Sequence, residues 1–96
     1  MGIDAVFRAL SDPTRREILR LLQSREMSAG EIAEHFSLAR STLSGHFNVL
    51  KAADLISTER RGSTIVYSLN VSAFEEALAA TMEFFRVGIG RKEGME

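Results

Sequence analysis

The feature that most constrains this chain is the stretch RSTLSGHFNVLK, in which large apolar and small polar residues alternate with the period of a helix. Leu43, Phe47 and Leu50 are spaced i, i+4, i+7, the spacing of a stripe that faces a core. The opposite face carries Ser41, Ser44, Gly45 and Asn48. Hydroxyl residues and glycine are poor helix formers. The pattern therefore predicts a helix whose outer face is kept small so that something large can come close.

A shorter helix is expected just before this one. Ser28 and Glu31 form the capping-box pattern S-x-x-E, in which each side chain bonds to the other residue's backbone. Ile32, Ala33 and Phe36 then share one face and predict a helix of about two turns. The residues FSLA leave room only for a tight connection. Two short helices joined in this way indicate a helix-turn-helix over residues 28–52.

Two further helices are predicted ahead of this unit. Apolar spacing predicts the first over residues 3–10. Asp12 is a favourable N-cap, and Pro13 suits the first helical position because its missing N–H would be unpaired there. A second helix is therefore expected from residue 13 to about residue 24.

The pattern changes after residue 54. β-Branched and aromatic residues lie on both sides of RRGS in the sequence LISTERRGSTIVYSLN, which predicts a hairpin over residues 55–69 with Gly62 in its turn. Asn70 and Ser72 mark the start of a last helix over residues 73–88, and its apolar stripe extends to Ile89. The final residues, 89–96, are rich in glycine and charge and are expected to form a flexible tail.

These elements define the expected fold class. It is mostly α with a small β-hairpin, in the order α-α-α-α-β-β-α, which is a winged helix-turn-helix with a helix added at each end. The chain of 96 residues is read as one such domain over residues 1–88, in which residues 55–69 are the wing.

The small face of the second helix-turn-helix helix suits the major groove of B-DNA, which admits one α-helix. Hydroxyl and amide groups can bond to base edges and phosphates, and arginine can pair with guanine or phosphate. The candidate DNA-binding residues are Arg40, Ser41, Thr42, Ser44, Gly45, His46, Asn48 and Lys51 on this helix, Arg60 and Arg61 at the hairpin tip, and Arg15.

Several of these residues also have ordinary structural explanations, which the sequence leaves open. A hydroxyl near residue 40 could cap the helix, and Gly45 could serve packing. Arg60 and Arg61 could form a solvated turn. His46 lies at the edge of the apolar stripe, so a structural hydrogen bond and a DNA contact are equally suited to it. Arg15 could contact phosphates or form ion pairs with nearby acidic side chains.

The composition excludes several classes of function. The chain has no cysteine, which excludes disulfides, thiol redox switching and thiolate metal sites. Two histidines are too few for a metal site with ordinary ligands, so no metal and no cofactor are expected. No paired nucleophile and base and no glycine-rich phosphate loop are present, so an enzyme is not expected. No apolar run approaches the ~20 residues of a membrane span and no secretory leader is evident, so a cytoplasmic protein is expected.

Three phrases carry a resemblance to a known family: ALSDPTRREILRLL, MSAGEIAEHFSLARSTLSGHFNVLKAADLI and RRGSTIVYSLN. Together, over residues 7–70, they resemble the ArsR-type winged-helix transcriptional repressors, most of all the SdpR-like autorepressors. The resemblance implies a homodimer, built from the first and last helices, that binds double-stranded DNA. Two apolar stripes agree with self-association, although they could instead close the core of one chain. The candidate interface residues are Ile3, Val6, Phe7, Phe74, Leu78, Met82 and Phe85.

The chain departs from many members of this family in its sensor positions. Many relatives bind metal through cysteine in the third helix, or through histidine and carboxylates on the last helix. Here the third helix has no thiol and the last helix has no histidine. We therefore expect a metal-independent and autoregulatory repressor that binds an inverted-repeat operator. Its regulation would come from autorepression, from a sequestering regulatory protein or from a small ligand.

Two alternatives remain at this point. One is a metal-responsive repressor with a non-thiolate site. The other is a winged-helix protein-interaction module, which the net charge of −1 keeps open.

Overall fold

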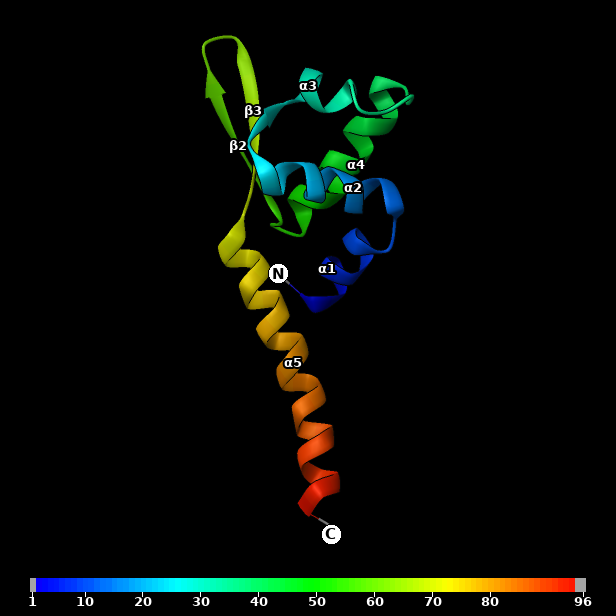
Figure 1. Ribbon diagram of the computed structural model, residues 1–96, viewed down its shortest axis with the longest axis vertical. Helices are drawn as coiled ribbons and strands as arrows, with labels where there is room; N and C mark the ends of the chain where they lie inside the picture. Colours follow the sequence, from blue (N-terminus) through cyan, green and yellow to red (C-terminus); the bar gives the residue numbers. More distant parts are fainter. Residues whose placement is uncertain (1, 95–96) are drawn as a thin grey trace.

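The computed structural model describes the backbone of residues 2–94 and the side chains of residues 2–86. Figure 1 shows a body from which one long helix extends, and the overall dimensions of 59 × 25 × 22 Å reflect this shape. The expected fold class, mostly helical with a small antiparallel hairpin, is confirmed. The elements in chain order are α1 (Ile3–Leu10), α2 (Pro13–Ser24), β1 (Met27–Ser28), α3 (Ala29–Ala33), α4 (Arg40–Ala52), β2 (Ile56–Arg61), β3 (Thr64–Leu69) and α5 (Val71–Gly94).

The start of α2 is set by local chemistry, as the sequence predicts. The Asp12 carboxylate accepts hydrogen bonds from the backbone N–H groups of Thr14, at 2.7 Å, and Arg15, at 3.2 Å, and Pro13 occupies the first turn. Burial alone would raise the pKa of Asp12. The backbone donors and nearby positive charge outweigh burial, so the pKa of this carboxyl lies below its ordinary value.

The capping box at the start of α3 is also confirmed. Ser28 Oγ accepts from the backbone N–H of Glu31 at 3.1 Å, and the Glu31 carboxylate accepts from the backbone N–H of Ser28 at 2.8 Å. The helix is shorter than the expected two turns and ends at Ala33. The backbone N–H groups of His35 and Phe36 bond to carbonyls three residues back, at 3.0 and 3.1 Å, and this tight turn ends the α-helical pattern.

A short strand between α2 and α3 was not predicted from the sequence. In β1, Met27 pairs with Tyr67 and Ser28 pairs with Val66, so β1 adds to the hairpin and gives a three-stranded antiparallel sheet in the order β1-β3-β2. A strand of two residues is too short to show an alternating pattern. It is a strand only because it pairs with β3, whose residues are far away in the sequence. Its effect is to fasten the base of the wing to the helical body.

The core lies beneath α4. Ile18, Ile32, Leu43, Leu50 and Leu55 have relative exposures below 2 %, and α1, α2 and the base of the sheet supply further apolar side chains. Among the described side chains, no buried polar atom lacks a hydrogen-bond partner. Apolar packing on its inner face therefore holds α4 on the body.

The last helix differs from its expected bounds at both ends. Asn70 accepts a weak bond from the backbone N–H of Ala73 at 3.4 Å, and α5 begins at Val71 rather than at residue 73. The helix continues to Gly94 rather than ending near residue 88, so the backbone of residues 89–94 is helical. Gly88 and Gly90 each lower helix stability by about 1 kcal/mol, but no proline interrupts the helix. The side chain of Ile89, and residues 95–96 of the expected tail, lie outside the described part of the chain.

Candidate nucleic-acid interface

The two faces of α4 match the sequence pattern. Leu43, Phe47 and Leu50 are buried in the core. The outer side carries exposed residues: Arg40, Ser41, Thr42, Ser44, Gly45, Asn48 and Lys51. The N-terminal end of α4 and the tip of the β2–β3 hairpin lie toward the same end of the body, away from the far end of α5 (Figure 1). One end of the molecule thus combines a small polar helix face with a projecting hairpin.

The hydroxyl groups of α4 are not used to cap the helix. The N-cap residue is Ala39, and it makes no side-chain capping bond. Among the hydrogen bonds of the described residues, none uses the side chain of Ser41, Thr42 or Ser44. This removes the capping explanation and leaves three hydroxyl groups free to bond to a partner.

Gly45 has no packing role among the described residues. A Cβ atom placed on Gly45 would meet no heavy atom within 4 Å apart from its neighbours in the helix, because this side of α4 faces open space. Glycine in the interior of a helix costs about 1 kcal/mol relative to alanine. Nothing inside the described chain compensates for this cost, so packing among the described residues gives no reason for glycine at this position.

His46 and Arg15 form a structural link between α4 and α1. The Arg15 guanidinium donates to the carbonyl oxygens of Ala9, at 2.8 Å, and Arg8, at 2.9 Å, and lies 3.1 Å from His46 Nδ1. Arginine can only donate, so Nδ1 of His46 is the acceptor in this contact. This favours the structural explanation for both residues. The link fixes α4 against the end of α1.

The wing turns as the sequence predicts. Arg61 pairs with Thr64, so the loop consists of Gly62 and Ser63, and Gly62 has a φ of +65°. A positive φ at the first loop position is what a type II′ turn requires, and glycine adopts it without strain. The two neighbouring arginines then point to opposite faces of the hairpin, because successive strand residues alternate.

Arg61 is held by carboxylates. Its guanidinium bonds to the carboxylates of Glu26, which lies just before β1, and Glu59, the latter at 2.9 Å. Both interactions raise the pKa of Arg61 further above its ordinary value, beginning with the hydrogen bond to Glu26. This arrangement was not predicted from the sequence, because Glu26 and Arg61 are 35 positions apart and no local signal links them.

Arg60 lies on the other face of the hairpin. It is opposite Ile65 in the register, on the same side as Tyr67, whose ring centroid lies 4.6 Å from that of Phe47 in α4. Arg60 therefore projects on the side of the wing that faces α4. Among the described residues, no carboxylate forms an ion pair with Arg60, Arg40 or Lys51. These three side chains bring uncompensated positive charge to the α4 side of the molecule.

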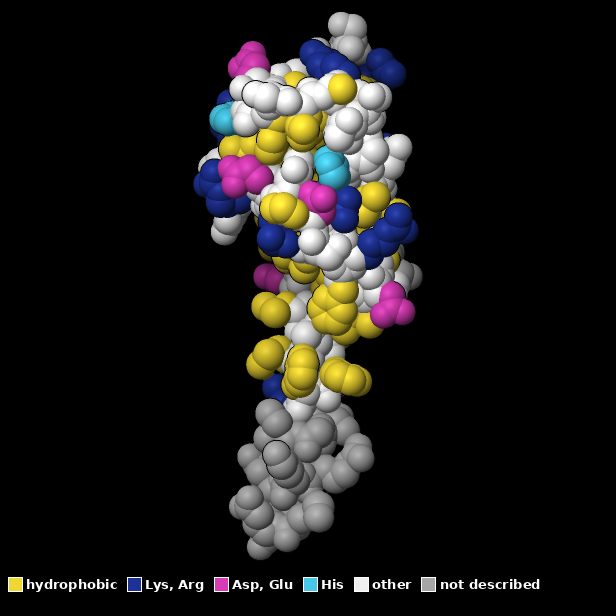
Figure 2. Space-filling model, turned by 90° about the vertical axis from the view of Figure 1, so that its right-hand side faces the viewer, with side chains coloured by type: hydrophobic (Ala, Val, Ile, Leu, Met, Phe, Trp, Pro, Cys, Tyr) yellow, Lys and Arg dark blue, Asp and Glu magenta, His cyan; other side chains and the backbone are white. Residues whose placement is uncertain are grey.

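The predicted interface residues on α1 and α5 divide into two groups. Val6 is only 6 % exposed and belongs to the core of a single chain, while Ile3 and Phe74 are partly buried. By contrast, exposure reaches 48 % for Phe7 and 64 % for Leu78, and Met82 and Phe85 are also more than half exposed. Figure 2 shows hydrophobic side chains standing out along the shaft of α5 below the body. Phe74 packs against the core of the single chain, but from Leu78 onward the α5 stripe does not, and Val6 is not available to a partner.

The structure brings no metal-binding cluster together in the part of the chain that it describes. No group of three or more histidine, aspartate and glutamate side chains is arranged to hold an ion there. No helix among the described residues is long and apolar enough to cross a membrane.

Comparison with known proteins identifies the class. Residues 10–59 match the family described as "Helix-turn-helix domain". Together with the winged fold and the free face of α4, this shows that the chain belongs to the ArsR-type winged-helix transcriptional repressors, which bind DNA and are not enzymes.

Individual members of this family are similar to the chain over most of its length. The chain is 46 % identical over 83 residues to the "Transcriptional repressor SdpR" of Bacillus subtilis, an alignment that covers 86 % of this chain and 92 % of that protein. A solved "ArsR-like Transcriptional Regulator from Rhodococcus sp. RHA1" superposes with a TM-score of 0.83 at 30 % identity, over 97 % of this chain and 87 % of the other. The crystal structure of NolR from Sinorhizobium fredii superposes with a TM-score of 0.69 at 34 % identity. That superposition covers 85 % of this chain and 82 % of NolR.

Proposed function

We propose that the protein binds an inverted-repeat operator as a homodimer and represses transcription by blocking access of the polymerase, including at its own gene. The observation that carries this proposal is the outer face of α4. It offers three hydroxyl groups without an intramolecular partner and a glycine with open space above it. A face of this kind suits entry into the major groove, where backbone and base edges come close.

The residues of α4 have distinct proposed roles. Ser41, Thr42, Ser44 and Asn48 bond to base edges or to phosphates, and an asparagine can pair with both N6 and N7 of adenine. Arg40, at the start of the helix, pairs with guanine or phosphate. Lys51, near its other end, pairs with a phosphate. His46 and Arg15 set the angle of the helix instead of contacting DNA.

The wing contributes through Arg60. Its side chain is free of carboxylates among the described residues and lies on the α4 side of the hairpin. There it can pair with a phosphate or enter the adjacent minor groove. Arg61 instead stiffens the wing through Glu26 and Glu59, since moving its guanidinium to DNA would leave two carboxylates close to the phosphates.

The proposed dimer uses the exposed apolar side chains of α1 and α5. Phe7, Leu78, Met82 and Phe85 form the proposed contact, with Ile3 and Phe74 at its edge. Contiguous exposed apolar surface of this kind marks interaction sites, and a small domain gains stability by covering it. A two-fold dimer would place the two α4 helices about one helical turn of DNA apart, roughly 34–36 Å.

The repressor is proposed to work without metal, in the cytoplasm where it meets DNA. This is supported by the absence of cysteine from the sequence and by the use of one of its two histidines in bonding to Arg15. Release from the operator would then depend on the level of the protein itself, on a protein that sequesters it or on a small ligand.

Fluorescence anisotropy tests the proposal. The purified protein is titrated into a labelled duplex of its own upstream region and into a scrambled duplex, at about 0.15 M salt, where specific sites typically bind at ~10⁻⁸–10⁻¹¹ M. We expect tight binding to the first duplex alone, with two protomers per site and no change on adding zinc or a chelator. Equal, weak binding to both duplexes would favour the protein-interaction module. Dependence on zinc would favour the metal-responsive alternative.

A further inference from the structure

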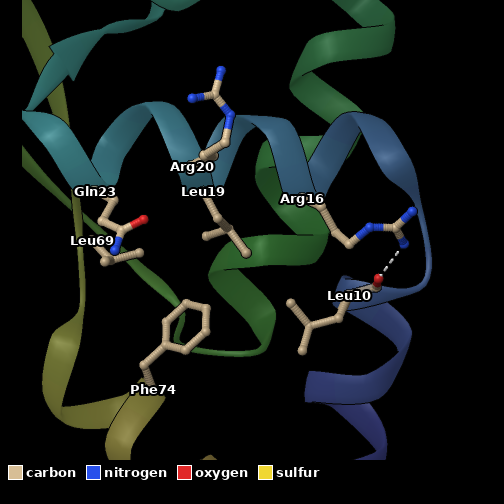
Figure 3. A pocket seen from close by; sticks show the side chains of 7 residues that line it. All are labelled: Leu10, Arg16, Leu19, Arg20, Gln23, Leu69 and Phe74. Carbon is tan, nitrogen blue, oxygen red and sulfur yellow. Dashed lines mark hydrogen bonds between the residues drawn. The ribbon is translucent and has the colours of Figure 1, made fainter.

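A pocket lies on the side of the body where α1, α2, β3 and α5 meet. Figure 3 shows Leu19 pointing from α2 toward the ring of Phe74, with Leu10 and Leu69 on either side of it. These four side chains give the pocket an apolar floor, and its volume is about 300 Å³. That volume is at the lower end of the range for small-molecule sites, which are mostly apolar with a few polar groups.

Two polar groups lie at opposite ends of this floor. In Figure 3 the Gln23 amide lies at the end near Leu69, and the Arg16 guanidinium lies at the end near Leu10. Arg16 donates one hydrogen bond, to the carbonyl oxygen of Leu10 at 2.8 Å. Its other N–H groups are free, since no bond or ion pair among the described residues uses them. No hydrogen bond within the described chain uses the Gln23 side chain either.

The charge of the pocket is positive. Arg16 and Arg20 are the charged residues that line it, and no acidic side chain does so. Arg20 is already neutralised by Glu17, with which it forms an ion pair. Arg16 is therefore the group that would attract an anion. Arg16 and Gln23 are both exposed, so an acidic group and an acceptor atom at the two ends of an occupant can reach them from the apolar floor.

We propose that this pocket binds a small amphipathic organic anion, with its apolar body on Leu10, Leu19, Leu69 and Phe74 and its acidic group on Arg16. An acceptor atom at the other end of the ligand would bond to the Gln23 amide. This binding does not depend on DNA binding and is measured in its absence.

The walls of the pocket could couple ligand binding to operator binding, because two of the lining residues belong to the wing and to α5. Leu69 ends β3, a strand of the wing, and Phe74 lies in the first turn of α5, the helix proposed to join two protomers. A ligand between them changes the packing between the wing and α5. Since coupling between two binding sites is reciprocal, a ligand that weakens DNA binding must itself be weakened by DNA.

The probe for the direct test is 8-anilinonaphthalene-1-sulfonate, an aromatic anion that fluoresces on apolar surfaces. It is titrated into the full chain without DNA, and decanoate and decanol are then compared as competitors. We expect saturable binding of one probe per protomer and displacement by decanoate far below the concentration needed with decanol. Arg16→Met should weaken probe binding by up to about fivefold, because Arg16 is exposed and solvent screens its pairing with an anion. Phe74→Ala should weaken it as well.

Two control variants separate the pocket from the rest of the surface. Arg86→Met removes an exposed arginine of α5, and Phe84→Ala removes an exposed aromatic side chain, and both should bind the probe as wild type does. Equal loss in Arg16→Met and Arg86→Met, or displacement by decanol as readily as by decanoate, would overturn the proposal. The proposal would also be overturned if saturable binding appeared only in monomers produced by Leu78→Glu. That result would mean that the second copy of the chain fills the pocket in the dimer.

Discussion

Replacing Gly45 with alanine should change stability and operator affinity in opposite directions, because it raises the first and lowers the second. The substitution adds one methyl group to the exposed face of α4, where it meets no heavy atom within 4 Å. Alanine is favoured over glycine in a helix interior by about 0.8–1.0 kcal/mol. Because no contact offsets this gain, the free energy of unfolding of Gly45→Ala should rise by about 1 kcal/mol. For a domain of this size that corresponds to a rise in Tm of about 4–8 °C.

The same methyl group should weaken operator binding. If the backbone of α4 lies close to base edges or phosphates at Gly45, a larger residue displaces the helix and loses at least one contact. The loss of one good base contact costs about 1–3 kcal/mol, which is roughly 5- to 150-fold in affinity. Thermal unfolding followed by circular dichroism and anisotropy on the operator duplex measure the two effects on the same preparation. Gly45→Gln should lower the affinity further.

Gly30→Ala is the matched control. It makes the same chemical change in α3, where the added Cβ would lie 3.9 Å from Ser28 Oγ, an ordinary contact. It should leave operator affinity unchanged. The reasoning is refuted if Gly45→Ala lowers the Tm, which would show a hidden packing role, or if both Gly45 variants bind the operator as tightly as wild type.

Three other predictions follow from the site and the fold. Arg60→Ala should weaken operator binding and reduce the salt dependence of the affinity by about one phosphate contact per protomer. Arg61→Ala should leave that salt dependence nearly unchanged. Equal salt dependence in the two variants would contradict the proposal that Arg60, and not Arg61, contacts DNA. Leu78→Glu should give a folded monomer with weak operator binding, because Leu78 is 64 % exposed in the single chain; sedimentation that still reports a dimer would remove α5 from the interface. Asp12→Ala should lower stability at neutral pH by about 0.5–2 kcal/mol through the lost cap, measured by urea unfolding. Since the pKa of Asp12 is depressed in the fold, its contribution is present above the unfolded value of about 3.9 and is lost as the pH falls through the folded pKa, a loss that Asp12→Asn should not show.

Local signals account for the parts of the fold that the sequence predicts well. The Asp12-Pro13 start of α2 and the capping box of α3 each depend on groups within three positions of one another. The stripe of α4 depends on spacing within one helix. These features need no information about the rest of the chain, and the structure confirms each of them.

Features that depend on distant residues were missed. β1 consists of two residues that become a strand only because β3 lies beside them, nearly forty positions later in the chain. The ion pair of Arg61 with Glu26 and the hydrogen bond of Arg15 to His46 join residues 35 and 31 positions apart. In both cases the sequence indicates a charged side chain but not its partner, and the partner decides whether the side chain is free to meet DNA.

The distribution of these partners also explains how a chain with a net charge of −1 can be a DNA-binding repressor. Several arginines are neutralised by nearby carboxylates, among them Arg20 by Glu17 and Arg25 by Glu31. Within the described residues, Arg40, Lys51 and Arg60 of α4 and the wing form no ion pair, and neither do Arg8, Arg15 and Arg16. Exposed charges more than about 10 Å apart are largely screened at ordinary salt. The field that a phosphate meets at α4 is therefore set by the cations near that helix, among them these three and Arg15 beside His46, rather than by the sum over the chain.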